Sequence, residues 1–109
     1  MHNATDATFS SMVLDRSATL PVVVDLWAAW CGPCRTLTPI LEKVVDENAG
    51  SVELVAVDVD KNPRTAQAFG VQSIPSVFAF KDGQVVDSFV GARSERAVRK
   101  FIAKLAARS

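Results

Sequence analysis

The stretch VVVDLWAAWCGPCR, which runs from Val22 to Arg35, decides the fold of this chain. It begins as an apolar run rich in β-branched residues, the pattern of a strand that is buried on both faces. Small residues and two cysteines follow, and from there the apolar residues recur at helical spacing. Cys31 and Cys34 therefore lie where a strand turns into a helix, and Gly32 and Pro33 separate them.

Two thiols at this spacing can close a disulfide, bind a metal or carry a haem, and the rest of the chain narrows the choice. Haem attachment requires a histidine directly after the second cysteine, where this chain has Arg35. A zinc site needs about four ligands, yet the only histidine is His2, and an iron–sulfur cluster lacks thiolates. A purely structural disulfide would stabilise the fold little, because it closes so short a loop. The sequence thus predicts a dithiol that cycles, and no metal site.

The expected helix start favours one of the two sulfurs as the nucleophile. The free N–H groups of a first helical turn stabilise a thiolate, which is the reactive form of cysteine. Pro33 suits a first turn, where its missing N–H costs no hydrogen bond, and Gly32 leaves the sulfur uncovered. We therefore expect Cys31 to be exposed and attacking, and Cys34 to be deeper and resolving.

Length and composition predict a single domain over residues 1–109, with residues 1–8 loose or forming a short edge strand. The chain has 12 basic and 12 acidic residues, so its formal net charge gives no reason to expect nucleic-acid or membrane binding. The first residues lack the basic start and apolar run of a signal peptide. A cytoplasmic location is therefore expected, where a lone disulfide is usually catalytic.

The hydrophobic pattern elsewhere predicts a mixed α/β fold. An apolar stripe from Leu37 to Val45 indicates a helix that Pro39 should kink and Gly50 should end. Ser10 or Ser11 is expected to cap an earlier helical turn. Further strands are expected at 53–59, 76–80 and 84–90, and further helices near 63–69 and 98–105. The prediction is a sheet of four to five strands flanked by helices on both faces, with a hairpin at Asp82-Gly83.

The segment Val-Asp-Leu-Trp-Ala-Ala-Trp-Cys-Gly-Pro-Cys-Arg, residues 24–35, resembles the active-site stretch of thioredoxins. Other matches follow in the family's order and spacing: Pro39, Asp58-Val59-Asp60, Asn62-Pro63, Ile74-Pro75, Lys81-Asp82-Gly83 and Gly91-Ala92. The resemblance covers nearly the whole chain. It implies the thioredoxin fold and thiol–disulfide exchange.

The resemblance also implies roles for individual residues. Pro75, which could otherwise be an ordinary trans proline, matches the family's cis-proline facing the dithiol. Trp27 is expected to be core beside the site, whereas Trp30 should shield the thiol. Expected supporting residues of the active site are Gly32, Pro33, Trp27 and Pro39. Expected substrate-binding residues are Trp30, Ile74, Pro75, Gly91 and Ala92.

Asp25 lies inside the apolar strand, where an ionised carboxylate is costly. It could reach the strand end and be solvated, or it could be a buried acid with a raised pKa that takes the proton of Cys34. The resemblance favours the second alternative. Thioredoxins often place a lysine near this acid, and the aligned residue here is Ala56. Without that partner, burial should raise the pKa further.

The function implied is reduction of disulfides in client proteins. A flavin-containing thioredoxin reductase using NADPH would restore the dithiol, and the protein itself, a monomer, would bind no cofactor. The Gly-Pro pair between the cysteines resembles the residues found at that place in the reducing members of the family. A different class stays open, because the run from Gln67 to Pro75 also resembles the thioredoxin domain of some bacterial tetratricopeptide co-chaperones. Such a domain would mainly bind unfolded clients.

Overall fold

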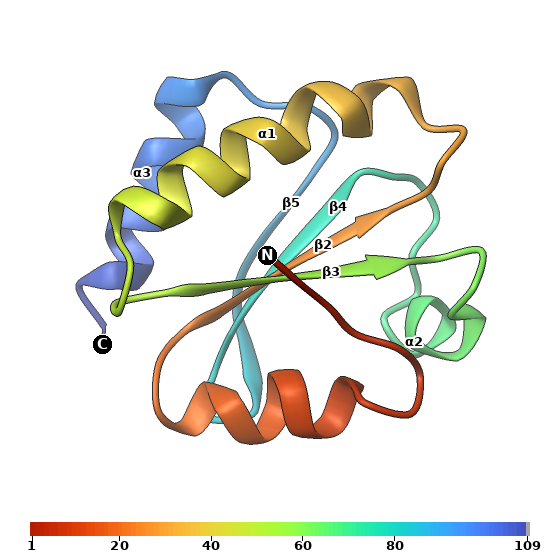
Figure 1. Ribbon diagram of the computed structural model, residues 1–109, viewed down its shortest axis with the longest axis horizontal. Helices are drawn as coiled ribbons and strands as arrows, with labels where there is room; N and C mark the ends of the chain where they lie inside the picture. The colour runs from red at the N-terminus through yellow and green to blue at the C-terminus, as the bar shows by residue number, and fades with distance from the viewer. Residues whose placement is uncertain (109) are drawn as a thin grey trace.

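A computed structural model describes residues 1–108 and places a five-stranded mixed sheet between two helical layers (Figure 1). The strand order is β1-β3-β2-β4-β5. The strands are β1 (His2–Asn3), β2 (Val22–Trp27), β3 (Glu53–Asp58), β4 (Ser76–Lys81) and β5 (Gln84–Val90). β1, β3 and β2 are parallel, whereas β4 runs antiparallel to β2 and β5 antiparallel to β4. The predicted mixed α/β architecture is confirmed.

The helices divide between the two faces of the sheet (Figure 1). One face is covered by α1 (Gly32–Glu47) and α3 (Glu95–Ala106), which pack against each other. The other face carries a π-helical segment, η1 (Ser10–Asp15), a 3-10 turn, η2 (Arg16–Ala18), and the short helix α2 (Pro63–Ala68). The right-handed rule for strand–helix–strand units is consistent with β2 and β3 lying as parallel neighbours, joined through α1.

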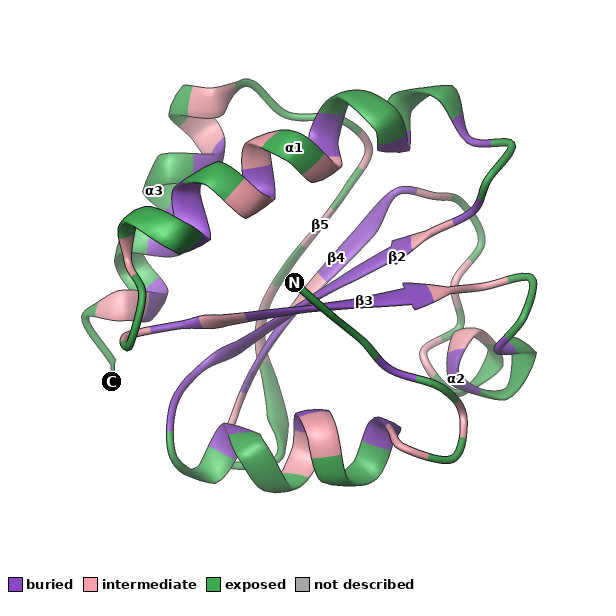
Figure 2. Cartoon of the chain, viewed as in Figure 1, coloured by how far each residue is buried: buried purple, intermediate pink, exposed green. Residues whose placement is uncertain are grey.

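The alternation of side chains along β2 decides which residues meet α1. Val22, Val24 and Leu26 pack in the apolar cluster on the η1 side of the sheet. Val23 belongs instead to the cluster that contains the buried residues of α1 and α3. Successive side chains of a strand point to opposite faces, so Asp25 shares the α1 face with Val23. Figure 2 shows the central strands as an almost continuously buried layer.

The start of the first helical segment differs from the expectation. Neither Ser10 nor Ser11 caps it, because the segment begins earlier and Phe9, which precedes η1, is already helical. Thr5 and Thr8 instead bond reciprocally: the N–H of Thr5 donates to Oγ1 of Thr8 at 2.8 Å, and the N–H of Thr8 donates to Oγ1 of Thr5 at 3.2 Å. This arrangement is equivalent to a capping box.

The predicted hairpin is confirmed, and hydrogen bonds to Ser17, which precedes β2, hold its turn in place. Asp82 and Gly83 join β4 to β5 with φ values of 54° and 76°, the sign that a type I′ turn requires. The buried hydroxyl of Ser17 accepts a hydrogen bond from the Gly83 N–H at 2.8 Å. The carbonyl of Ser17 accepts another from the Asp82 N–H at 2.9 Å. The segment before β2 thereby anchors the tip of the hairpin.

Candidate active site

Cys31 and Cys34 form a disulfide at the amino end of α1. Cys31 occupies the position before the helix in an extended conformation, with φ −86° and ψ 106°. The backbone N–H of Cys34 donates a hydrogen bond to Sγ of Cys31 at 3.2 Å. Pro33 lies in the first turn, where no N–H is needed. The geometry therefore directs a backbone donor and the positive end of the helix dipole at the sulfur of Cys31.

The expected exposure of Cys31 is wrong for this disulfide-bonded form. Cys31 is only 3% exposed and Cys34 2%, so burial does not distinguish the two sulfurs. Both cysteines form a small apolar cluster with Ala28, and Val59 and Ile74 from two other loops pack against it. Cys31 is therefore buried because these side chains from other loops cover it, in addition to α1.

Trp30 lies on the surface and is tied to the loop after β3. Its side chain is 68% exposed, and its indole Nε1–H donates a hydrogen bond to Oδ2 of Asp60 at 2.8 Å. There it lines a shallow cavity of about 270 Å³ with Val59, Ile74 and residues of α2. The expected role of Trp30 as a shield of the thiol stays a prediction.

Three loops meet around the disulfide. The Ile74–Pro75 peptide bond is cis, as the resemblance implied. The N–H of Gly91 donates to the carbonyl oxygen of Pro75 at 2.8 Å, and Gly91 has a φ of +88°, a backbone conformation that favours glycine. The N–H of Val59 donates to the carbonyl oxygen of Trp27 at 2.9 Å. Ala92, which follows Gly91, is exposed. The loops that carry the cysteines, Val59, Pro75 and Gly91 thus lie at one end of the sheet.

Asp25 is fully buried, which excludes the solvated alternative. Burial raises the pKa of its carboxyl group to about 6. The acid has a hydrogen-bond partner that the sequence did not indicate, because Oγ1 of Thr38 on α1 donates to its Oδ2 at 2.7 Å. This hydrogen bond lowers the pKa and partly offsets the burial, while the charge of Glu42 raises it. Among residues 1–108, Oδ1 of Asp25 has no hydrogen-bond partner.

The geometry unites a disulfide, a helix start and a buried acid, and comparison with known proteins identifies the family. The Thioredoxin family model matches residues 1–104. The chain belongs to the thioredoxin family. It is 48% identical over 88 residues to thioredoxin 1 of Synechococcus elongatus, covering 81% of this chain and 80% of that protein.

Other thioredoxins match over similar or longer stretches. The chain is 48% identical over 94 residues to thioredoxin of Mycobacterium bovis, covering 86% of this chain and 79% of that protein. Thioredoxin of Rickettsia felis is 38% identical over 103 residues, 94% of this chain and 96% of its own length. The Cys31–Cys34 pair is thus the redox-active centre of a thioredoxin-family thiol–disulfide oxidoreductase.

Sequence reasoning missed three polar residues near this thioredoxin-family site. Thr38 and Asp60 contact Asp25 and Trp30, as described above. Asp6 anchors the start of α2: its carboxylate accepts hydrogen bonds from the N–H of Thr65 at 2.8 Å and from Oγ1 of Thr65 at 2.7 Å. A polar residue on the buried side of a helical pattern could have drawn attention to Thr38. Nothing local in the sequence indicates the other two contacts.

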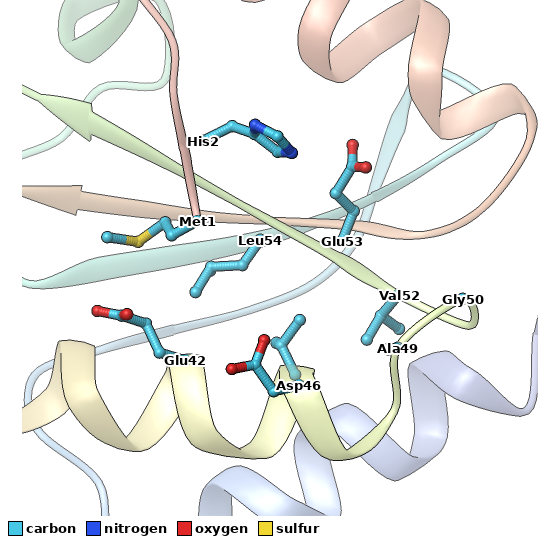
Figure 3. A pocket seen from close by; sticks show the side chains of 10 residues that line it. Met1, His2, Glu42, Asp46, Ala49, Gly50, Val52, Glu53 and Leu54 are labelled. Atoms are coloured by element: carbon cyan, nitrogen blue, oxygen red, sulfur yellow. The ribbon is translucent and has the colours of Figure 1, made fainter.

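A second hollow lies away from the disulfide, and in the part of the chain that the structure describes its lining does not form a metal site. A hollow of about 190 Å³ lies between β1, β3 and the second half of α1, and Glu42, Asp46 and Glu53 line it together with His2 (Figure 3). Within residues 1–108, however, no three His, Cys, Asp or Glu side chains are grouped so that they could hold a metal ion. In the same part of the chain, no helix has the length and apolar composition needed to cross a membrane.

Proposed function

We propose that this protein reduces disulfides in other proteins, with Cys31 as the attacking thiolate and Cys34 as the resolving thiol. The observation that carries the proposal is the position of the pair at the start of α1, where the Cys34 N–H already donates to Sγ of Cys31. The same donor stabilises a negative charge on that sulfur in the reduced form. Cys34 itself lies inside the first turn of α1, and within residues 1–108 we find no backbone N–H that donates to its sulfur.

The exchange proceeds in two steps that balance in electrons. The Cys31 thiolate attacks a client disulfide, which forms a mixed disulfide and releases one client thiolate. Cys34 then loses its proton and attacks Sγ of Cys31, which forms the Cys31–Cys34 disulfide and releases the second client thiolate. The client gains two electrons and the protein loses two. We assign Asp25 as the acceptor of the Cys34 proton, since its raised pKa of about 6 lies close to neutral pH.

The client is proposed to lie across the loops that surround the disulfide. Trp30 and Ile74 offer apolar surface beside the cysteines. Pro75 and Gly91, joined by a backbone hydrogen bond, form the adjoining wall, and Ala92 continues it with a small side chain. The backbone of Ile74 is positioned to pair with an extended client segment. Gly32, Pro33, Trp27 and Pro39 support this arrangement without contacting the reacting sulfurs of the client.

We further propose that a flavin-containing thioredoxin reductase restores the dithiol with electrons from NADPH. The relatives named thioredoxin support this assignment. The protein is proposed to act as a cytoplasmic monomer and to need no bound cofactor, because both half-reactions are thiol chemistry.

The test is NADPH oxidation coupled to reduction of a protein disulfide, such as that of insulin, with a bacterial thioredoxin reductase present. Turnover that requires all three components is expected. The matched control is Cys31→Ser, which should abolish turnover. No turnover by the unmodified protein with several reductases would contradict the proposal. Protection of an unfolded client that persists after both cysteines are replaced would favour the co-chaperone class instead.

A further inference from the structure

The hydroxyl group of Thr38 lies between a buried acid and an open pocket. Its Oγ1 donates to Oδ2 of Asp25 at 2.7 Å, and Asp25 itself is fully buried. On its other side, Thr38 lines a mainly apolar pocket of about 480 Å³. Trp27 and Cys34 line the same pocket. Thr38 is therefore in contact both with the carboxyl group and with a space that water can enter.

We propose that Thr38 is the positioning residue of Asp25 and the link through which this buried acid exchanges its proton with water in the pocket. The proposal rests on the proposed function, in which Asp25 accepts the proton of Cys34. It adds a residue to that step and a route by which the proton leaves. Thr38 acts through Asp25, to which its hydroxyl is hydrogen-bonded.

The two oxygens of Asp25 have different surroundings, which gives them different tasks. Oδ2 is occupied by the Thr38 hydroxyl, whereas Oδ1 is buried and has no partner among residues 1–108. Fixing Oδ2 therefore leaves Oδ1 as the free acceptor for the thiol proton of Cys34. A buried carboxylate charge is costly, and accepting a proton neutralises it.

The transfer of this proton from Asp25 to water also balances in atoms and charge. A hydroxyl group both donates and accepts, so it can take a proton from one neighbour while giving its own to another. After resolution, Asp25 carries the proton from Cys34. The carboxyl group first rotates about its Cβ–Cγ bond, so that the newly protonated oxygen faces Oγ1 of Thr38. Transfer of that proton to Oγ1, with simultaneous transfer of the hydroxyl hydrogen to a water in the pocket, then returns Asp25 to the carboxylate. Thr38 is unchanged, and water has accepted one proton.

Few other groups could perform this role. On α1, Glu42 raises the pKa of Asp25 by its charge, and Arg35 lines the same pocket with an exposed side chain. The register neighbours of Asp25 on β3 and β4 are Ala56 and Val77, which carry no polar side chain. Within residues 1–108, the Thr38 hydroxyl makes the only side-chain hydrogen bond to the carboxyl group.

The test compares Thr38→Val, Thr38→Ser and Thr36→Val in rapid-mixing experiments that follow decay of the mixed disulfide with a peptide disulfide. Thr38→Val keeps the shape of the side chain and removes the hydroxyl. It should slow resolution about tenfold near neutral pH and move the midpoint of its pH profile upward. Thr38→Ser should restore most of the rate and the midpoint. Thr36 is exposed on the same helix, and its variant should resolve at the normal rate.

Two results would overturn the inference. One is a Thr38→Val protein with a normal pH profile and resolving rate. The other is a Thr38→Ser protein as impaired as Thr38→Val, which would make the methyl group rather than the hydroxyl responsible. Asp25→Asn, measured alongside, separates this inference from the proposed function. Slow resolution in Asp25→Asn with normal resolution in Thr38→Val would refute only the role of Thr38. Normal resolution in Asp25→Asn would refute the role of Asp25 itself.

Discussion

Asp25 and Ala56 are register neighbours on the parallel strands β2 and β3, and both are fully buried. Side chains at paired positions of adjacent strands point to the same face, so a methyl group lies beside the carboxyl group. The family resemblance predicts that this position, where a lysine is often expected in thioredoxins, leaves Asp25 without a cationic neighbour. The neighbouring strand therefore supplies no positive charge to Asp25, and within residues 1–108 the carboxyl group accepts a side-chain hydrogen bond only from Thr38.

Replacing Asp25 with Asn should remove the loss of stability that the unmodified protein shows as pH rises through the acidic range. The folded pKa of about 6 lies above the ordinary aspartate pKa of 3.8, so between these values the unfolded chain releases a proton that the folded chain retains. The free energy of unfolding must then fall as pH rises through this window, by roughly 3 kcal/mol in all. Urea titrations of the oxidised protein from about pH 4 to about pH 8 measure this slope.

The matched control for that experiment is Asp15→Asn, because Asp15 is exposed. It should retain the slope of the unmodified protein. Asp25→Asn should also be more stable than the unmodified protein near neutral pH, since no charge remains buried. Parallel slopes for Asp25→Asn and the unmodified protein would show that Asp25 ionises as easily in the folded chain as in the unfolded one.

Cys34→Ser should accumulate mixed disulfides with client proteins, whereas Cys31→Ser should not. Without the resolving thiol, the bond between Cys31 and the client has no internal attacker. Non-reducing gels of lysate exposed to each purified variant, followed by reduction, measure the captured protein. Equal capture by Cys31→Ser would reverse the assignment of the attacking sulfur.

Asp60→Ala should weaken client binding more than it changes the chemical step. The carboxylate of Asp60 holds the exposed indole of Trp30 through one hydrogen bond at 2.8 Å. Loss of this bond frees the indole, and KM for a peptide disulfide should rise about threefold to tenfold. Asp60→Asn retains an acceptor oxygen and is the matched control. A KM that is unchanged in Asp60→Ala would show that the orientation of Trp30 does not matter for clients.

Ser17→Ala should lower the free energy of unfolding by about 1–3 kcal/mol. The buried Ser17 hydroxyl donates to the carbonyl oxygen of Leu14 at 2.7 Å and accepts from the N–H of Gly83 at 2.8 Å. Alanine would leave the Gly83 N–H without this partner. Ser10 is exposed, and Ser10→Ala serves as the control in the same urea titrations. Equal midpoints for both variants would contradict the prediction.

Local patterns in the sequence predicted the framework of the fold well. The β-branched run of β2, the apolar stripe of α1 and the Asp82-Gly83 turn are each encoded within a few neighbouring residues. The family resemblance added the cis bond before Pro75, which no periodicity reveals. For Asp25, the apolar neighbours in the strand left two alternatives open, and the resemblance favoured burial, which the structure confirms.

Contacts between distant segments could not be predicted in the same way. Trp30 and Asp60 are 30 residues apart, and Asp6 and Thr65 are 59 apart, so neither pair leaves a periodic signal. The burial of Cys31 depends on side chains from two other loops, which sequence reasoning about its own helix omitted. Thr38 was missed because its contact depends on the rotation of α1 over the sheet.

The bonding of the first six residues bears on how the protein can be handled in the laboratory. The N–H of Ala4 donates to the carbonyl oxygen of Ala56 at 2.9 Å, and Asp6 holds the start of α2, which lines one side of the cavity at Trp30. A bulky affinity tag joined ahead of His2 would therefore disturb a segment that is hydrogen-bonded to β3 and to the start of α2. A tag at the carboxyl terminus leaves these hydrogen bonds intact. We therefore expect that kinetic constants measured with an amino-terminal tag and with a carboxy-terminal tag will differ.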